Sequence, residues 1–254
     1  MTNRSCDHRM VQYHVLTYAT HSGGTYECLI HDGRMHGIEI KTLGWGTKWT
    51  GFCDKLRAMR DEIQSYDARD VVVFIDGFDS RLHDSLNTLK YKFATHFPDA
   101  FAGNSVLFSK DVSYDLPIVP HCVQKYMTYR IFGGEINSGM YMGRVRKLRQ
   151  LLDRALRLED HCKGDDQRAF NRLKSHIVTD DRQLIFKNLS CEERKMPQTQ
   201  SGSSVFTSCP GSLTMDRVHR AVYDYAPFFD KEIVGVVVLI VAVCLAVDTV
   251  GTTT

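Results

Sequence analysis

The sequence lacks several features that would point directly to a function. Its 254 residues contain 32 lysines and arginines against 30 aspartates and glutamates, so a net charge of +2 gives no electrostatic reason to expect nucleic-acid binding. The eight cysteines include no CxxC or CxxxC pair, which excludes a zinc ribbon because both ligand pairs would be missing. With 43% hydrophobic and 24% charged residues, the chain is an ordinary globular protein with a sizeable core.

The amino-terminal end also lacks an apolar stretch. Residues 1–9 are polar, and no hydrophobic core of signal-peptide length follows them. Disulfides persist mainly in oxidising compartments. We therefore expect reduced cysteines and a cytosolic location for the amino-terminal domain.

One long hydrophobic run is present, near the carboxyl end. Ile233–Val247 contains fifteen residues without a charge. As a helix it would be about 22 Å long, against roughly 30 Å for the hydrocarbon core of a bilayer. A buried strand or helix is one interpretation. A single-pass tail anchor is the other, and the four aromatic residues between Tyr223 and Phe229 favour it as an interfacial belt.

Strand-like and helix-like segments alternate through the rest of the chain. Val71–Ile75, an unbroken apolar run, is typical of a central strand buried on both faces. The alternation predicts an α/β fold with a mostly parallel sheet flanked by helices. The expected strands are Val11–Tyr18, Ile38–Leu43, Val71–Ile75, Ser105–Ser109, Ile136–Met142 and Leu184–Phe186; the expected helices are one capped by Thr50 that carries Phe52, Leu56, Met59 and Ile63 on one face, Arg144–Leu158, Asp166–His176 and Leu213–Tyr225.

Two acidic residues follow the most hydrophobic strand, in the segment Asp76-Gly77-Phe78-Asp79. Ligands of open α/β sheets collect beyond the carboxyl ends of the strands. Carboxylate oxygens suit Mg²⁺ or Mn²⁺, and such a cation could hold a diphosphate. A solvated turn in which one aspartate caps the next helix is the alternative.

Two further segments carry polar groups that could meet a ligand. Asn137-Ser138-Gly139 combines hydrogen-bonding side chains with a residue that lets the backbone approach closely, although a strand with a glycine bulge would also explain it. Asp165 and Asp166 open an expected helix, where the helix dipole stabilises acidic residues. They could also orient an acceptor hydroxyl or act as a base.

Taken in order, these motifs resemble the glycosyltransferase domain of the procollagen lysyl hydroxylases and the related collagen glucosyl- and galactosyltransferases. The resemblance runs from about Gly44 to Asn188. It rests on Asp76-Gly77-Phe78-Asp79 where the family has Asp-x-x-Asp, on Leu107-Phe108-Ser109, on Asn137-Ser138-Gly139 with Gly143, on Asp165-Asp166-Gln167, and on Ile185-Phe186-Lys187-Asn188.

The resemblance implies a GT-A (Rossmann-like) fold and the transfer of glucose or galactose from UDP-glucose or UDP-galactose to a hydroxyl of a protein or glycan, with Mn²⁺ or Mg²⁺ as the metal. It also implies a role for each matching position. Asp76 and Asp79 would hold the metal and diphosphate, and Phe78 would stack on uracil. Asn137 with Ser138 and Gly139 would contact the donor, and Asp165 and Asp166 would face the donor sugar and the acceptor. Lys48 or Lys55 would neutralise a phosphate unless it is a solvated helix charge.

Two departures from the family pattern leave alternatives open. The family has a late His-Gly motif that supplies a third metal ligand, whereas Phe206–Ser212 has no histidine and offers only Cys209, a soft ligand for Mn²⁺. The family's Cys-Trp-Pro is also absent from Lys110–His121. A non-catalytic, membrane-tethered protein that binds nucleotide sugars is one alternative. An aspartyl-phosphate phosphatase is another, although its chemistry wants a second aspartate where Phe78 stands.

The expected organisation is one GT-A domain followed by short segments. The domain takes up residues 1–212, and a carboxyl-terminal helix takes up 213–232. The hydrophobic segment at 233–247 would anchor the protein in a membrane, with the domain in the cytosol and a polar tail at 248–254.

Overall fold

The structure is a computed structural model that describes residues 9–111, 136–158, 166–189 and 204–208, all within the unit that spans residues 1–211. In this part of the chain, six strands form a main sheet in the order β2-β1-β3-β6-β5-β7, and three form a smaller sheet in the order β4-β9-β8. The strands are β1 (Tyr13–Tyr18), β2 (Ile40–Leu43), β3 (Val71–Asp76), β4 (Ser80–Leu82), β5 (Val106–Lys110), β6 (Ile136–Arg144), β7 (Ile177–Thr179), β8 (Phe186–Asn188) and β9 (Phe206–Ser208).

The main sheet is mostly parallel, as the alternation of elements predicts. β1 pairs in parallel with both β2 and β3, and β5 pairs in parallel with β7. The exception is β6, which runs antiparallel to its two neighbours, β3 and β5. The expected central strand at Val71–Ile75 is therefore confirmed, but it is parallel to its neighbour on one side only.

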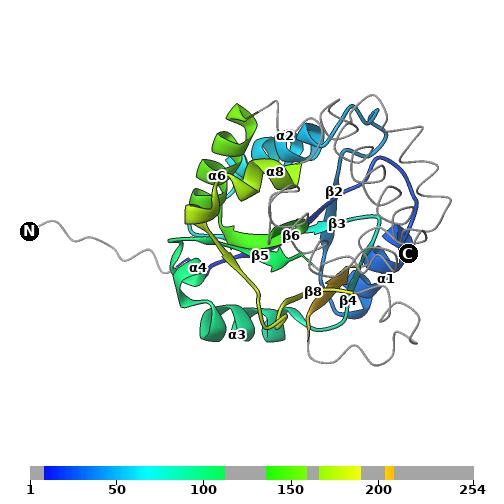
Figure 1. The fold of residues 1–254 in the computed structure, drawn as a ribbon. Helices are drawn as coiled ribbons and strands as arrows, with labels where there is room; N and C mark the ends of the chain where they lie inside the picture. Colours follow the sequence, from blue (N-terminus) through cyan, green and yellow to red (C-terminus); the bar gives the residue numbers. More distant parts are fainter. Residues whose placement is uncertain (1–8, 112–135, 159–165, 190–203, 209–254) are drawn as a thin grey trace, which may run out of the picture. The chain divides into compact units, whose positions relative to one another are not determined.

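Helices cover both faces of the main sheet (Figure 1). α2, α6 and α8 lie on one face, and α1, α3 and α4 on the other. The described helices are α1 (Tyr26–Met35), α2 (Cys53–Glu62), α3 (Leu86–His96), α4 (Pro98–Ala102), α6 (Val145–Arg157) and α8 (Asp166–Asn171), with short 3₁₀ turns η1 (Ile63–Ser65) and η3 (Lys174–His176).

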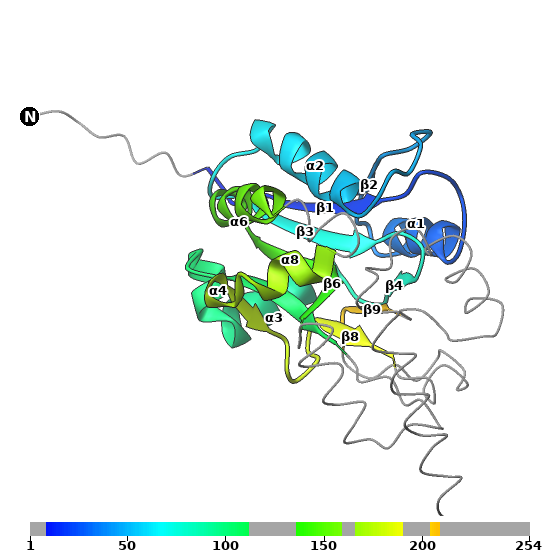
Figure 2. The ribbon, with the colours of Figure 1, turned by 45° about the horizontal axis from the view of Figure 1, so that its top comes forward.

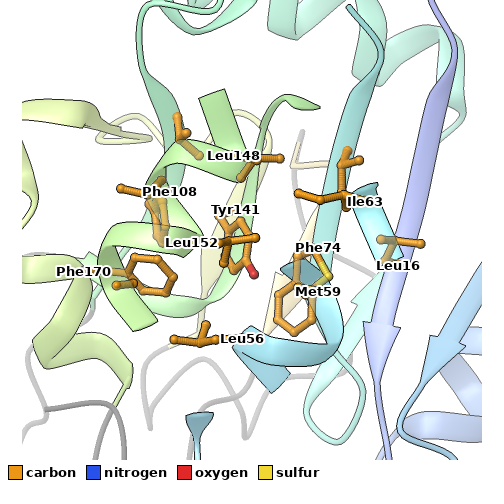
Figure 3. Packing of buried hydrophobic residues seen from close by; sticks show 14 of the residues in the cluster. Leu16, Leu56, Met59, Ile63, Phe74, Phe108, Tyr141, Leu148, Leu152 and Phe170 are labelled. Atoms are coloured by element: carbon orange, nitrogen blue, oxygen red, sulfur yellow. The ribbon is translucent and has the colours of Figure 1, made fainter. Parts of the chain in front are cut away.

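Strand periodicity divides the buried residues into two layers. On β3, Val72 and Phe74 face α2, α6 and α8, whereas Val71, Val73 and Ile75 face the other side. In the first layer the Tyr141 ring stacks between two phenylalanine rings, with centroid distances of 4.9 Å to Phe74 and 4.8 Å to Phe108 (Figure 3). Because every residue of Val71–Ile75 is fully buried, β3 is held in place by packing from both faces.

Two expected helices differ in detail from the prediction. Thr50 does not cap α2: the cap position is Phe52, and Thr50 instead donates its backbone N–H and its hydroxyl to the Asp54 carboxylate. An aspartate inside the first turn therefore reaches back to the preceding loop. The expected helix over Asp166–His176 ends at Asn171, and the 3₁₀ turn η3 follows it.

The cysteines correct one expectation. Cys53, buried at the start of α2, is disulfide-bonded, so the prediction of reduced cysteines is wrong for it. Cys28 is free and exposed, which places the partner of Cys53 outside the described residues.

The carboxyl-terminal predictions fall beyond the part of the chain that the structure describes. These are the helix at 213–232, the hydrophobic segment at 233–247 and the tail at 248–254. Among the residues that the structure describes, no helix is long and apolar enough to cross a membrane.

Candidate active site

Asp76 and Asp79 lie at the carboxyl end of β3, as predicted. Asp76 is the last residue of the strand, and its Oδ1 accepts a hydrogen bond from the backbone N–H of Phe78 at 3.1 Å. Asp79 lies in the turn before β4, where its Oδ1 accepts hydrogen bonds from the hydroxyls of Ser208 at 3.0 Å and Ser80 at 3.2 Å. Both serines therefore bond to the same oxygen, and in the described part of the chain no hydrogen bond is made to Oδ2 of Asp79, which remains for another ligand.

The two carboxylates affect each other electrostatically. Burial, and then the negative charge of Asp76, raise the pKa of Asp79 to about 7, although the two serine hydrogen bonds and Lys55 oppose the shift. In the absence of a cation, the Asp79 carboxyl is therefore partly protonated near neutral pH. A divalent cation would favour the ionised form of Asp79.

This shift predicts that the metal-free protein loses stability as the pH rises from about 4 to about 7. The pKa of Asp79 lies above its usual value of 3.8, so across this window the folded chain holds a proton that the unfolded chain has released. Full burial would make the loss about 4 kcal/mol, and the partial exposure of the side chain reduces it to about 1 to 2 kcal/mol. Urea unfolding of wild type and Asp79→Asn at pH 4.5 and 7.5 measures it. The wild type should lose this much more stability than the variant, and equal losses would contradict the assignment.

Lys55 and Asp166 form a buried ion pair beside residues 76–79, the segment with Asp76 and Asp79 that we call the acidic turn. Lys55 Nζ lies 2.9 Å from Asp166 Oδ2 and 3.9 Å from Asp76 Oδ2. The side chains of Lys55 and Asp166 are only 6% and 2% exposed, and Asp166 Oδ1 accepts a hydrogen bond from the Ser138 hydroxyl at 2.9 Å. Burial opposes the charge on Lys55, but Asp166 and then Asp76 more than offset it, so the pKa of Lys55 is raised. Lys55 is thus a charged residue of the site and not a solvated helix charge.

Asn137, Ser138 and Gly139 form a bulge at the start of β6. Residue pairing with β5 passes from Tyr141 opposite Phe108 directly to Asn137 opposite Ser109, so residues 138–140 have no partner on β5. Asn137 Oδ1 accepts a hydrogen bond from the Gly139 backbone N–H at 2.8 Å. A Cβ at Gly139 would lie only 2.9 Å from that oxygen and 3.7 Å from Asp76 Cβ, which keeps a larger residue out. The bulge therefore brings all three predicted residues next to β3.

Phe78 is half-buried and lies against the loop that joins β1 to α1. Its ring centroid is 5.2 Å from that of His21, and its carbonyl accepts a hydrogen bond from the Thr25 backbone N–H at 2.9 Å. Gly24 has a φ of +56°, and a Cβ there would lie 2.0 Å from the Phe78 carbonyl oxygen. Gly24 therefore allows this loop to approach and hold the turn at residues 76–79.

The structure does not bring every predicted residue into the site. Lys48 is exposed in the loop between β2 and α2, and in the described part of the chain no hydrogen bond or ion pair joins it to the acidic residues. Asp165 and Cys209 lie outside the described residues. Among the described residues, no group of three histidine, cysteine, aspartate or glutamate side chains could hold a metal ion.

A family model described as the PLOD GT domain, where GT denotes glycosyltransferase, matches residues 9–208 of this chain. The chain belongs to the PLOD GT domain family. The match includes every described element of both sheets, so the resemblance expected from the five motifs is confirmed.

Two curated relatives of this PLOD GT domain are named for activities on procollagen lysine. The chain is 26% identical over 199 residues to the multifunctional procollagen lysine hydroxylase and glycosyltransferase of Caenorhabditis elegans. It is 26% identical over 202 residues to a procollagen-lysine,2-oxoglutarate 5-dioxygenase of Drosophila melanogaster. Each match covers 69% of this chain and 25% of the relative, so the chain spans about a quarter of their length.

A solved structure shows that the PLOD GT domain fold seen here occurs in another glycosyltransferase. A glycosyltransferase involved in the glycosylation of the major capsid of PBCV-1 matches with a TM-score of 0.50 at 12% identity. The match covers 84% of this chain and 98% of that one. The mixed α/β glycosyltransferase fold expected from the sequence is therefore confirmed.

Sequence reasoning missed two groups that support the acidic turn of this PLOD GT domain. Ser208, on β9, holds Asp79 from 129 positions away in the chain, and no local pattern marks it. Asp32 on α1 forms an ion pair with Arg81 on β4, with 2.6 Å between Oδ2 and Nε, and also accepts the Leu82 backbone N–H. An aspartate at a buried position of an otherwise apolar helix face is a signal that could have found this second contact.

Proposed function

We propose that this chain is a metal-dependent glycosyltransferase that transfers glucose or galactose from a UDP-sugar to a hydroxyl of a protein or glycan. The observation that carries the proposal is the placement of Asp76 and Asp79 beside the Lys55–Asp166 pair in a PLOD GT domain. The fold shared with a solved glycosyltransferase supports the reaction class.

The acidic turn fits a divalent cation by its donor chemistry. Oδ2 of Asp79 is left over by the two serine hydrogen bonds, and Oδ2 of Asp76 has Lys55 only at 3.9 Å. Two hard carboxylate oxygens suit Mn²⁺ or Mg²⁺ and not a soft cation. When bound, the metal would offset the negative charge that develops on the UDP leaving group.

Lys55 would add a second positive charge at the same place. The ion pair with Asp166 fixes the lysine ammonium beside Asp76, where the diphosphate of the donor would meet the acidic turn. Asp166 Oδ1 accepts the hydrogen bond of Ser138, and Oδ2 faces the Lys55 ammonium at 2.9 Å. We therefore assign Asp166 to holding Lys55 in place, and its neighbour Asp165 to the donor sugar or acceptor.

The remaining predicted residues would bind the ends of the donor. Phe78, half-exposed beside His21, offers an aromatic face for the uracil base. The bulge at Asn137, Ser138 and Gly139 lies against Asp76 and offers hydrogen bonds and backbone access to the sugar and diphosphate. The donor would thus extend from the β1–α1 loop across the end of β3 to β6.

The test of the proposed function is UDP release by the purified chain. We expect release from UDP-glucose or UDP-galactose in the presence of Mn²⁺ or Mg²⁺, and a fall to background with a chelator. A coupled UDP assay across the common UDP-sugars measures it. If the folded protein releases no UDP from any of them, the enzymatic proposal fails for these donors.

Calorimetry of the same samples separates the alternatives. Binding of a UDP-sugar without UDP release would support the non-catalytic, nucleotide-sugar-binding homologue. The aspartyl-phosphate phosphatase loses its support, because Phe78 stands where a second aspartate is needed and residues 9–208 match a glycosyltransferase domain.

We also propose that residues 233–247 anchor the protein in a membrane. The support is the fifteen-residue uncharged run and the aromatic residues before it. After carbonate extraction of membranes from expressing cells, we expect the protein in the pellet, and its appearance in the supernatant would contradict the anchor. Protease protection of intact vesicles then decides between the proposed cytosolic side and the lumenal side. An oxidising lumen would suit the Cys53 disulfide.

A further inference from the structure

Asn188 lies next to the acidic turn, in the smaller sheet. It is the last residue of β8 and stands directly opposite Ser208 of the parallel strand β9. Residues opposite each other in neighbouring strands project from the same face of a sheet, about 4.8 Å apart. Since Ser208 donates to Asp79, Asn188 is one strand away from the residue that holds the acidic turn. Figure 2 shows β4, β9 and β8 side by side.

The orientation of the Asn188 amide is fixed by the main sheet. Its Nδ2 lies 2.5 Å from the carbonyl oxygen of Lys110, the last residue of β5. A carbonyl can only accept a hydrogen bond, so the NH₂ group must face Lys110 and the oxygen must face away from it. Lys110 follows Ser109, whose hydroxyl donates to the Asn137 carbonyl at 3.1 Å. Asn188 is therefore linked through the end of β5 to the bulge of β6.

Among the described residues, the amide oxygen of Asn188 has no hydrogen-bond partner. The residue is 1% exposed, and Oδ1 is buried without a donor from this part of the chain. Buried polar atoms are normally paired because a lost hydrogen bond to water costs free energy. An unpaired acceptor that is locked in position beside a proposed ligand site is a place where a ligand donor would be favourable.

We propose that Asn188 Oδ1 accepts a hydrogen bond from a hydroxyl of the hexose in the sugar donor, an inference that rests on the proposed function. The diphosphate is excluded as the partner because at neutral pH it carries acceptors and no protons. The uracil and ribose also carry donors, but the proposed donor position places the uracil at Phe78 with the ribose beside it. The hexose hydroxyls then supply the donor that this oxygen lacks. Asn188 thus joins Asn137 in recognising the sugar, and it distinguishes donors by the position of one hydroxyl.

The experiment is a double-mutant cycle in which one change is made in the protein and the other in the sugar donor. Wild type and Asn188→Ala are compared with UDP-glucose, UDP-galactose and their 2-, 3-, 4- and 6-deoxy forms, by kcat/KM for UDP release. With wild type, removal of one particular hydroxyl should lower kcat/KM by about 10- to 100-fold, the range of one buried hydrogen bond. With Asn188→Ala, removal of the same hydroxyl should lower kcat/KM by less than about threefold, because that hydroxyl has already lost its acceptor. Binding of UDP alone should be the same for both proteins.

Asn171→Ala is the matched control. Asn171 also donates its Nδ2 to a backbone carbonyl, that of Gln167 at 2.9 Å, and its Oδ1 is also buried and unpaired. It lies at the end of α8 away from Asp166. This variant should keep the full deoxy-sugar penalty of wild type.

The failures of the two proposals are distinguishable. Equal deoxy-sugar penalties in wild type and Asn188→Ala, with UDP release intact, would overturn the role of Asn188 alone. Absence of both UDP release and metal-dependent binding of any UDP-hexose by wild type would overturn the proposed function and this inference with it. If Asn188→Ala does not fold, the side-chain amide signal of Asn188 in the wild-type NMR spectrum decides. With Mg²⁺ it should shift on adding the UDP-hexose and not on adding UDP, and no difference between the two would overturn the inference.

Discussion

Lys55→Met is expected to lower the free energy of unfolding by about 3 to 5 kcal/mol, because it leaves the buried carboxylate of Asp166 without its partner. Asp166 is 2% exposed, and Ser138 alone would then stabilise its charge. Methionine is close to lysine in length and apolar, so the change removes the charge with little loss of packing. Guanidinium unfolding followed by circular dichroism at pH 7 measures the effect.

A second lysine offers a matched control for this prediction. Lys41 also forms an ion pair, at 2.6 Å with Glu62, but its side chain is 55% exposed. Lys41→Met should therefore cost less than about 1 kcal/mol. The double variant Lys55→Met/Asp166→Asn should recover much of the stability that Lys55→Met loses, because the unpaired charge is gone. Similar losses for Lys41→Met and Lys55→Met would show that the buried pair is not the cause.

Asp79→Asn is expected to reduce metal-dependent UDP release by about 100- to 1,000-fold. A bound metal stabilises developing charge by several kcal/mol, and each 1.4 kcal/mol is a factor of ten in rate. Asparagine keeps the shape of the side chain and can still accept the hydrogen bonds of Ser80 and Ser208, so what is lost is the charged oxygen. Asp76→Asn should have an effect of the same size. Initial rates of UDP release at several Mn²⁺ concentrations measure both.

The other Asp-x-x-Asp segment of the chain, Asp67 to Asp70, supplies the control. Asp67 bonds to Arg69 in the loop before β3, at the opposite end of that strand from Asp76. Asp67→Asn should keep the rate within about twofold of wild type. Asp79→Asn should not be less stable than wild type at pH 7 without metal, because the wild-type carboxyl is disfavoured in its ionised form there. A folded Asp79→Asn protein that keeps a rate within fivefold of wild type would rule out the metal role.

The sequence predicts those elements of the fold that have a clear local pattern of apolar residues. The unbroken apolar run identified β3, and its end identified Asp76 and Asp79 as candidate site residues. The helix α1 was missed because its inward face includes Asp32 and Gly33, which interrupt the apolar spacing. Asp32 is buried only because Arg81 pairs with it, and that pairing exists only in the folded chain.

The direction of β6 was not predictable in the same way. A period of two shows which residues of a strand face the core, but it is identical for a strand that runs the other way. Reversal matters for the site, because it is the beginning of β6 that meets the end of β3. Met140 stands opposite Ile75, so Asn137, Ser138 and Gly139 lie at the Asp76 end of the sheet.

Lys55 shows the limit of assigning charged residues from sequence. Its position on α2 fitted a solvated helix charge, the more common case, or a phosphate ligand, and Lys48 fitted both roles as well as Lys55 did. The contact with Asp166, 111 positions further along the chain, distinguishes the two lysines. Lys55 is buried and paired with Asp166, whereas Lys48 is exposed. Such a contact depends on how α2 and α8 pack on the same face of the sheet.

The reversed strand β6 also sets the order in which this protein can be completed during synthesis. β3 and β5 are made before β6, yet each needs β6 as its neighbour in the sheet. Until residue 144 has been made, β3 pairs only with β1, and its other edge, along the apolar run Val71–Ile75, is a site for wrong association. Ser208 is made later still, so the turn at residues 76–79 reaches its final hydrogen bonding only after residue 208 has been made. We therefore expect truncations before residue 136 to aggregate, and any activity to require the residues up to Ser208.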